Sequence, residues 1–566
     1  PGRLLEAMGK DVWAFKGEKA EAWSNYWRPG FVLFLGLEYR LFGLESTVPW
    51  HLANVLLHLL VTLLGWRLLR VWGVNEGPAF AAALLFAVHP AHVESVAWIS
   101  GSPDLLLAAF LLGAWLVLLE GGDSPSWTRR GISLALYAGA LSCKEVSILF
   151  PGLVLLSRSL LLRDGGSRRL LRAAKDAAPY AVLAGIYLFA RASVLGQVQI
   201  ETPWRVGPVG LLLTAPSLVF FYLRQALFPV LIGPSYPHRA VTPQLAGLEN
   251  LVAPLLLGAL LVAALWLFCR ERHVRLLGLG TFFLLLAPAM NVDAFTPEQT
   301  AHDRYLYLPL LGLLAVVTTI LSALPALAGP RGKVLLGIAT ALLALQTVRY
   351  NTAWTSEDRL WAWAVRSDPT SSGNLAEHGR KLLEAGDTAG ARAALDQAIA
   401  LRPSVSAYLG RSDVALAEKR YADAAKDLEL VKQQQPGNFL VYDRLAVAYQ
   451  GGGDLTAAER VLREARERIP YRRAAYTDNL AVVLVLTQRP GEALTELEAV
   501  RETARVEIGS GAAAVFYHLG LLYEGLSRGP EAQASFREFL ERSATYHDDE
   551  TKRLREDATK RRTAMP

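Results

Sequence analysis

The chain has little charge and almost no cysteine. Only 19% of its 566 residues are charged, whereas 52% are hydrophobic, and the mean hydropathy is positive. A composition this apolar excludes an ordinary soluble globule and favours a membrane protein. Cys143 and Cys269 are the only cysteines, and both stand inside apolar stretches. A disulfide framework and a thiolate metal site are therefore excluded.

The sequence also lacks the short motifs of several enzyme classes. It contains no glycine-rich phosphate loop, no zinc-ligand spacing and no serine-nucleophile motif. No signal-peptide pattern precedes the first apolar stretch, and the first residue is Pro1 rather than Met. We therefore expect the native N-terminus to lie before Pro1.

Residues 1–353 are predicted to form a multi-pass membrane domain, because apolar stretches of roughly membrane-spanning length recur between residues 48 and 349. Several are shorter than the roughly 20 residues of an isolated spanning helix, but short segments span when they pack inside a bundle. We therefore predict an all-α fold: a polytopic helical bundle with about ten or eleven crossings. The stretches cover residues 48–66, 77–90, 104–119, 131–147, 148–162, 177–190, 209–232, 251–269, 276–291, 305–328 and 333–349.

The net charge of +6 arises mainly from short basic clusters between these stretches. This is the pattern of cytoplasmic loops rather than of nucleic-acid binding, and we expect no nucleic-acid partner. The remaining loops and the C-terminal domain then face outward, into the periplasm if the protein is in a bacterial inner membrane, or into the lumen if it is in the endoplasmic reticulum. The clusters are Arg67/Arg70, Arg129/Arg130, Arg163/Arg168/Arg169/Arg172/Lys175, Arg270/Arg272/Arg275 and Arg331/Lys333.

The stretch 209–232 does not fit this scheme as a single crossing. One passage through the membrane here would invert every later loop and place Arg270, Arg272 and Arg275 outside. We therefore predict that residues 209–232 form a re-entrant segment or a shallow hairpin.

Residues 354–546 show a period close to that of the 34-residue tetratricopeptide repeat (TPR). Small residues recur where the two helices of each hairpin touch, and a leucine follows four positions later on the same face. The pattern predicts an α-solenoid of about five repeats, followed by a charged tail at 547–566. The recurring residues are Ala391, Ala424, Ala458 and Ala493, Leu395, Leu428, Leu462 and Leu497, and Tyr517, Gly520, Tyr523, Ala532 and Phe536.

The sharpest local signal is the run from His89 to Glu94, where Pro90 can end a spanning helix. His92 and Glu94 could orient an acceptor, shuttle a proton or assist a metal ion. The alternative is structural: His89 and His92 cap the helix and hydrogen-bond across the loop. Asp104 follows at the start of the next segment, where an N-capping role is favoured.

A polar stripe runs along the first complete segment. His51, Asn54 and His58 are spaced i, i+3 and i+7, so they lie on one face of an otherwise apolar helix. Such groups face the bundle interior or a wet cavity. Interhelical hydrogen bonds are favoured over direct catalysis.

Charged residues near segment ends are candidates for binding a lipid-linked phosphate. Lys144-Glu145 and Glu38 with Arg40 each suggest a self-satisfied ion pair. A basic residue facing the outer leaflet could instead bind phosphate, and Arg224 and Arg304 are further candidates for this. In that alternative Tyr236 and His238 would line the same cavity. Asp303 beside Arg304 suggests either an ion pair or a charged rim.

In order and combination, these features resemble the transmembrane and tetratricopeptide-repeat O-mannosyltransferases, integral-membrane glycosyltransferases of the GT-C class. The resemblance covers nearly the whole chain. Its residues are Tyr26-Trp-Arg-Pro29, Trp50-His-Leu-Ala-Asn-Val-Leu-Leu-His58, His89-Pro-Ala-His-Val-Glu94, Lys144-Glu145, Asp303-Arg-Tyr-Leu-Tyr-Leu-Pro309 and the repeats.

The resemblance implies a GT-C bundle that transfers a sugar from a polyprenyl-phosphate donor to a hydroxyl, often Ser or Thr, with the repeats presenting a polypeptide acceptor. A carboxylate would activate the hydroxyl, and basic residues would hold the departing phosphate. The family's paired acidic motif is expected before Pro1. Catalytic roles fall to Glu94, His92 and His89, phosphate binding to Lys144, Arg224 and Arg304, and supporting roles to Arg28, His51, Asn54, Asp104, Glu145 and Asp303.

Two other functions stay open. A non-catalytic membrane scaffold would use the repeats to bind a partner protein and would need no acidic pair. A transporter would also carry polar residues within its spanning helices. We rank it last because the spanning part shows no inverted internal repeat. A divalent metal ion is left open as a cofactor.

Overall fold

The computed structural model describes residues 9–10, 12, 26–163, 165–196, 205–237, 240–241, 252–269, 271–295, 300–327 and 329–564. These residues form helices and one isolated antiparallel β-bridge, between Tyr236 and Ala301, and no strand. They fold into two compact units that divide after Asn374. The all-α fold predicted from the sequence is confirmed.

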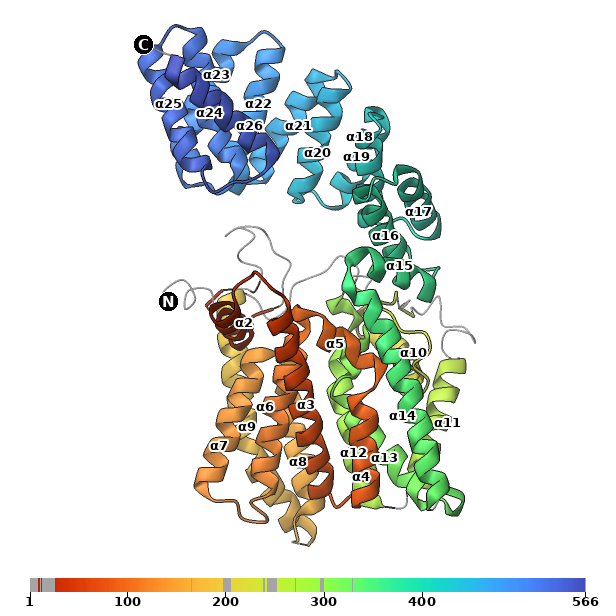
Figure 1. The fold of residues 1–566 in the computed structure, drawn as a ribbon. Coiled ribbons are helices and arrows are strands. Elements are labelled where there is room, and N and C mark those ends of the chain that lie inside the picture. Colours follow the sequence, from red (N-terminus) through yellow and green to blue (C-terminus); the bar gives the residue numbers. More distant parts are fainter. Residues whose placement is uncertain are drawn as a thin grey trace. The chain divides into compact units, whose positions relative to one another are not determined.

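The first unit is the membrane bundle (Figure 1). Each predicted apolar stretch coincides with one of its helices. The helices are α2 (Pro29–Phe42), α3 (Val48–Val71), α4 (Glu76–Ala87), α5 (Val93–Ala97), α6 (Ser102–Leu119), α7 (Trp127–Cys143), α8 (Phe150–Leu161), α9 (Gly166–Leu195), α10 (Gly207–Leu227), α11 (Ala253–Phe268), α12 (Arg272–Leu286), α13 (Pro309–Ala323), α14 (Pro330–Asn351) and α15 (Glu357–Ser367).

Short 3-10 turns join several of these helices. They include η2 (Pro90–His92), η3 (Ile99–Gly101), η4 (Glu145–Leu149), η9 (Asp303–Leu306) and η11 (Thr352–Thr355).

The chain is a multi-pass membrane protein. Within the described residues, six helices are long and apolar enough to cross a bilayer, or seven if the bent pair α4 and η2–α5 counts as one broken span. The predicted number of crossings is reached only by adding the four shorter helices α7, α8, α11 and α13. Segments of that length depend on their neighbours in the bundle to span.

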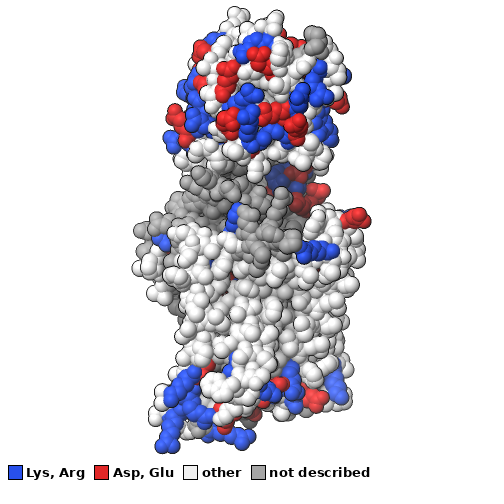
Figure 2. Space-filling model, turned by 90° about the vertical axis from the view of Figure 1, so that its left-hand side faces the viewer, with Lys and Arg blue, Asp and Glu red and all other residues white. Residues whose placement is uncertain are grey.

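Charge is distributed along the bundle as expected for a membrane protein. Figure 2 shows a broad uncharged belt, with Lys and Arg gathered beyond one edge of it. The basic clusters stand at the end of α3 and at the starts of α7, α9, α12 and α14, which lie together at one end of the bundle (Figure 1). Arg270, one member of these clusters, lies outside the described residues.

Helices α12 and α13 cross in direct backbone contact. A Cβ on Gly278 would lie 2.5 Å from the Gly312 carbonyl oxygen, and a Cβ on Gly312 would meet the Gly278 carbonyl in return. Small residues permit such close approach and are the usual means of helix packing in membranes.

Helix α6 lies at the centre of the bundle, because most of its residues are buried. Helix α14 is peripheral, because its apolar residues are not buried by other helices.

Helix α10 differs from the other long helices because both of its ends contact the segment between α12 and α13. At its start, the Val206 amide donates to Asp293. At its end, Gln225 donates to Asp303. Asp293 and Asp303 both belong to that connecting segment, which lies away from the basic end of α12. These contacts favour the re-entrant or shallow path over a full crossing by α10.

The second unit is a tetratricopeptide-repeat solenoid of five helical hairpins in the described chain. Its predicted contact residues are fully buried, including Ala391, Ala424, Ala458, Ala493 and Ala532. The hairpins are α16 (Ser372–Glu384) with α17 (Thr388–Leu401), α18 (Val405–Ala417) with α19 (Tyr421–Gln434), α20 (Phe439–Gly451) with α21 (Leu455–Arg468), α22 (Arg473–Leu486) with α23 (Pro490–Val506), and α24 (Ser510–Gly525) with α25 (Gly529–Ser543).

The ends of this unit differ from the boundaries proposed from the sequence. The bundle extends to Asn374 rather than to residue 353, because η11, α15 and the first turn of α16 pack with it. The segment 547–566 is largely the helix α26 (Asp549–Ala564). It covers the last hairpin, where Tyr517 donates to Asp557 and Ala558 is buried.

Candidate functional site

The candidate site lies at the end of the bundle opposite the basic clusters, where helix α4 stops at His89-Pro90. The His89 Nδ1 accepts a hydrogen bond from the Ala91 amide at 3.2 Å, and its Nε2 donates to the Ala226 carbonyl at 3.1 Å. His89 therefore caps the turn and holds it to the end of α10. This is the structural alternative weighed for it in the sequence.

His92 does not make the hydrogen bonds that the same alternative expected. Its ring is buried, and within the described residues neither ring nitrogen has a partner. The ring packs between Phe86, Tyr307 and His58, with centroid separations of 4.3, 4.7 and 5.4 Å. A buried polar group with no partner is costly to the fold, so His92 is a candidate for a role beyond packing.

Glu94 is held by Arg304, which lies 210 residues later in the sequence. The Arg304 guanidinium donates to Glu94 Oε1 at 2.5 Å, and the Arg304 backbone amide donates to Oε2 at 3.0 Å. His302 Nδ1 lies 3.3 Å from the same carboxylate. Side chain and backbone of one residue thus grip both oxygens of a buried acid, which fixes α5 against η9.

Lys144 and Glu145 do not pair with each other, contrary to the self-satisfied pair expected from their adjacency. The Lys144 Nζ donates to Asp104 at 2.5 Å, and Arg28 donates to both oxygens of Glu145, at 3.0 and 2.6 Å. Adjacent side chains after α7 point in different directions because the backbone there is extended. Asp104 therefore supports Lys144 as well as opening helix α6.

These three pairs form one group, here called the outer ion cluster: Arg28, Glu94, Asp104, Lys144, Glu145 and Arg304. Tyr305 links two of the pairs, since its ring lies 5.6 Å from Lys144 Nζ and 5.3 Å from the Arg304 guanidinium. Trp98 covers Arg304 from 5.6 Å. Each cation comes from the end of a helix or turn at the same end of the bundle.

Electrostatic balance within the cluster is tight. The pKa of Lys144 is lowered, mainly by burial and further by the nearby charges of Arg28 and Arg304. The Asp104 carboxylate acts in the opposite direction but offsets only part of that lowering. For Glu145, burial acts to raise the pKa, but Arg28 and then Lys144 outweigh it and the pKa is lowered. Three cations are therefore held close together by three internal carboxylates.

Asp303 does not pair with its neighbour Arg304, so of the two alternatives given for these residues the ion pair is wrong. Its carboxyl accepts hydrogen bonds from Gln225 Nε2 at 3.0 Å and from the Tyr236 hydroxyl at 2.8 Å. Burial raises the pKa of Asp303 to about 7, and the nearby Glu94 carboxylate acts in the same direction. Asp303 therefore anchors the segment before Arg304.

The remaining residues proposed from the sequence lie outside the cluster. His51 is exposed on α3. Asn54 donates to the Val96 and Trp98 carbonyls, and His58 contacts Tyr307, so these two make interhelical hydrogen bonds as favoured. Arg224 is exposed on α10, and no hydrogen bond or ion pair among the described residues joins it to the cluster.

The proposed Glu38–Arg40 pair is absent from the described contacts: Arg40 is exposed, whereas Glu38 is buried with Oε1 unpartnered. Burial raises the pKa of Glu38 to about 7. His238 and residues 296–299 lie outside the described part of the chain. In the described part, no group of three or more His, Cys, Asp and Glu side chains is placed to hold a metal ion.

Sequence reasoning missed several residues that complete the site. His302 and Trp98 contact Glu94 and Arg304, and Gln225 contacts Asp303. Gln225 stands next to Arg224, and an amide in an apolar segment is itself a signal for a buried hydrogen bond.

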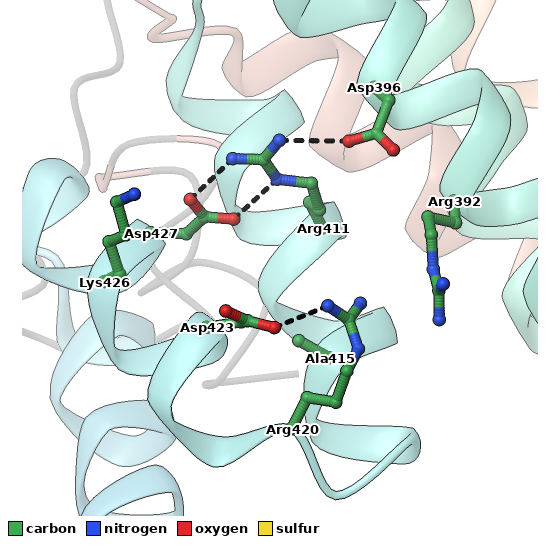
Figure 3. A pocket seen from close by; sticks show the side chains of 8 residues that line it. All are labelled: Arg392, Asp396, Arg411, Ala415, Arg420, Asp423, Lys426 and Asp427. Atoms are coloured by element: carbon green, nitrogen blue, oxygen red, sulfur yellow. Dashed lines mark hydrogen bonds and ion pairs between the residues drawn. The ribbon is translucent and has the colours of Figure 1, made fainter.

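A second polar feature, a surface pocket of about 250 Å³, lies in the repeat unit. Figure 3 shows Arg411 between Asp427 and Asp396, with Nε–O and N–O distances of 2.7 and 3.0 Å. Arg420 pairs with Asp423 in the same view. Most of the charges that line this pocket between the first two repeats are therefore paired with one another.

Comparison with known proteins gives two kinds of match. A family model described as "Tetratricopeptide repeat" matches residues 377–439. The chain is 25% identical over 439 residues to the human "Protein O-mannosyl-transferase TMTC4", which covers 67% of this chain and 58% of that protein. It is 38% identical over 130 residues to the Drosophila melanogaster "Protein O-mannosyl-transferase Tmtc2", which covers 22% of this chain and 14% of that protein.

Among solved structures, "MamA 41-end from Desulfovibrio magneticus RS-1" matches with 22% identity and a TM-score of 0.25, over 32% of this chain and 99% of that one. The chain thus spans only part of the curated relatives it matches: 14% of the Drosophila protein and somewhat over half of the human one. The resemblance to TMTC-type proteins predicted from the sequence is confirmed.

Proposed function

We propose that this chain, which is similar to TMTC-type protein O-mannosyl-transferases over two thirds of its length, is a membrane glycosyltransferase that uses a polyprenyl-phosphate sugar. The observation that carries the proposal is the outer ion cluster: three buried or partly buried cations at the end of the bundle away from the basic loops, two of which, Lys144 and Arg304, lie against the ring of Tyr305. Mannose is the sugar named for the relatives, and the acceptor would be a protein hydroxyl.

The cations suit a phosphate ester better than a neutral sugar. A guanidinium offers several donors in a fixed plane and binds phosphate with charge-assisted hydrogen bonds. Arg304 is partly exposed, with its side chain 19% accessible, so a ligand can approach it while Glu94 holds it from behind. Trp98 and Tyr305 provide aromatic surface against which a sugar ring could lie.

The chemistry would exchange one glycosyl bond for another. The acceptor oxygen bonds to the anomeric carbon, the carbon–oxygen bond to phosphate breaks, and polyprenyl phosphate leaves with its electron pair. Arg304, Lys144 and Arg28 would stabilise the charge developing on that phosphate. The hydroxyl proton would pass to a carboxylate, and Glu94 becomes available for this once the donor phosphate replaces it on Arg304.

Topology supports an outward-facing reaction. The basic clusters occupy the opposite end of the bundle, which the positive-inside rule assigns to the cytoplasm. The cluster would then face the periplasm or lumen. The repeat unit would select a polypeptide acceptor on the same side.

The test is sugar transfer by the full chain in lipid nanodiscs, with polyprenyl-phosphate mannose and a Ser/Thr-containing peptide. Arg304→Met should lower kcat/KM by about 100-fold or more, since it removes a charge-stabilising donor. Arg331→Met, an exposed arginine at the basic end, is the matched control and should leave transfer unchanged. Equal transfer by both variants, or none by the parent with any polyprenyl-phosphate sugar, would overturn the proposal.

A non-catalytic scaffold is the second candidate, favoured by one observation. Every cation of the outer ion cluster already has an internal carboxylate partner, as expected for a structural network. In that case polyprenyl phosphate would not bind, and the Arg304→Met variant would lose stability without losing any affinity for the lipid.

A further inference from the structure

The segment from Leu231 to Pro237 lies between two sets of buried hydrogen bonds. On one side it contacts α15 and the first turn of α16, where the repeat hairpins begin in the sequence. On the other side it contacts residues 301–303, which immediately precede Arg304. All of these residues belong to the membrane unit.

The contacts toward α15 converge on one carbonyl. Trp363 Nε1 donates to the Ile232 carbonyl at 2.8 Å, and the Ser367 hydroxyl donates to the same oxygen at 3.0 Å. The Ser235 hydroxyl donates to Asn374 Oδ1 at 3.1 Å. Ile232, Ser235 and Asn374 are at most 3% exposed. Water cannot readily replace a bond lost here, so each one constrains the segment.

The contacts toward Arg304 are equally direct. Tyr236 and Ala301 exchange backbone hydrogen bonds of 2.9 and 3.1 Å. The Tyr236 hydroxyl donates to Asp303, and His302 Nδ1 donates to the Pro234 carbonyl at 2.7 Å.

The next residue is Arg304, whose backbone amide donates to Glu94. The position of that amide depends on the turn 301–303, and the turn is fixed by the segment 231–237.

Resting on the function proposed above, we infer that the 231–237 segment positions Arg304, and that Trp363, Ser367 and Asn374 are positioning residues acting through it. Helix α15 and the first turn of α16, here called the root of the repeat domain, are thereby coupled to the end of the bundle that carries Arg304. A change at the root alters how firmly Arg304 and Glu94 are held. In this inference Trp363, Ser367 and Asn374 contact neither the sugar donor nor the polypeptide acceptor, and act only through the 231–237 segment.

The coupling predicts an effect over a distance along a defined chain of contacts. Replacing Trp363 by Phe and Ser367 by Ala keeps the ring beside Tyr350, at 5.5 Å in the parent, but leaves the buried Ile232 carbonyl without its two donors. The segment would loosen, and the turn at Asp303 with it. Coupling of this kind typically changes an equilibrium by about 5- to 150-fold.

Hydrogen exchange by mass spectrometry on the full chain in nanodiscs tests the coupling without any assay of activity. In Trp363→Phe/Ser367→Ala, peptides covering 300–308 should exchange about fivefold faster or more. Ser235→Ala and Asn374→Ala should also speed exchange of these peptides. Ser235→Thr keeps the hydroxyl, so its exchange should stay as slow as in the parent. Asn479→Ala, an exposed asparagine on α22, is the matched control.

Parent-like exchange at 300–308 in both the double variant and Asn374→Ala would overturn the inference. A fall in thermal stability together with faster exchange throughout the bundle would also overturn it, since it would show general loosening.

A kinetic arm separates this inference from the proposed function. If the parent transfers mannose, the double variant should lower kcat/KM for polyprenyl-phosphate mannose about fivefold or more, because Arg304 both binds the donor phosphate and stabilises the charge that develops on it. An unchanged kcat/KM in the double variant would contradict the positioning of Arg304. If the parent transfers no sugar, the proposed function fails, and the exchange experiment still decides whether the root residues control the Arg304 turn.

Discussion

At the scale of single residues, the bundle's chemistry rests on buried charges whose partners come from distant parts of the sequence. Arg28 and Glu145 are 117 positions apart, Lys144 and Asp104 are 40 apart, and Glu94 and Arg304 are 210 apart. Such pairs add little net stability when intact, but they are costly to break one-sidedly. This asymmetry gives the first prediction.

Lys144→Met should destabilise the protein by about 3–5 kcal/mol, because it leaves Asp104 buried without its cation. The double variant Lys144→Met/Asp104→Asn should recover most of that loss, since no uncompensated charge is left. Thermal unfolding in detergent, followed for both variants and the parent, measures the difference. Two equally destabilised variants would show that the lysine matters through its packing rather than its charge.

Asp303 gives a pH-dependent prediction. Its pKa in the fold is about 7 against an ordinary value of 3.8, so between these values the native state binds a proton that the unfolded chain has released. Its contribution to stability is therefore full at low pH and is lost as pH rises through about 7.

As the pH falls from about 8 to about 5, the melting temperature of the parent should therefore rise relative to that of Asp303→Asn. Asp549→Asn, whose carboxylate is almost fully exposed, should track the parent at both values. A difference between the parent and Asp303→Asn that stays constant across this range would contradict the raised pKa.

At the scale of helices, two kinds of close packing dominate. In the bundle, α12 and α13 touch through glycine backbones. In the repeat unit, a small residue and a large apolar residue recur in each hairpin, as in Ala424 with Leu428. Each arrangement has a matched position outside the close contact that serves as its control.

Gly278→Ala should destabilise the bundle by about 1–3 kcal/mol, because the new methyl group would meet the Gly312 carbonyl, and a backbone cannot yield as a flexible side chain does. Gly258→Ala on α11 has nothing within 4 Å of the added carbon and should be neutral. Chemical denaturation in mixed micelles compares the two. Equal effects would mean that the helices separate readily to admit the methyl group.

Leu428→Ala should cost the repeat unit about 2–5 kcal/mol through the cavity it leaves. Leu430→Ala on the same helix removes a side chain that is 37% exposed and should cost much less. Circular dichroism of the full chain, read at the repeat unit's own transition, distinguishes them. Similar losses for both would argue against the buried seam that the repeat spacing predicts.

The helices and the repeats could be predicted because their signals are local. A period of about 34 residues and alanines four positions before a leucine follow from packing within one hairpin. The outer ion cluster could be predicted only as a set of candidates: Lys144 and Glu145 are adjacent in sequence, yet each pairs elsewhere. The sequence does not indicate which helix ends are in contact, so the partners of Glu94 and Asp303 could not be predicted.

At the scale of the whole molecule, two environments share one chain. The bundle presents an uncharged belt with cations beyond one edge, and the repeats carry mixed charge (Figure 2). Both native cysteines are buried, which leaves the surface free of reactive thiols. This permits a direct test of orientation.

Ser46→Cys and Ser167→Cys place a thiol at opposite ends of the bundle, each at an exposed serine. In intact spheroplasts, an impermeant maleimide should label Ser46→Cys but reach Ser167→Cys only after the membrane is broken, since the latter sits among the basic residues. The parent should stay unlabelled. Labelling in the reverse order would place the outer ion cluster in the cytoplasm.

The pairing inside the outer ion cluster also sets a threshold for any anion that enters. Each cation already has a carboxylate at 2.5–3.0 Å, so chloride or another small monoanion would shed its water and displace a partner of equal charge for no gain. A ligand that succeeds must bring more charge, or binding energy from elsewhere in its structure, as a lipid chain in the bilayer does. After sugar transfer, the same carboxylates compete with the polyprenyl phosphate product for the cations. This competition favours release of the product.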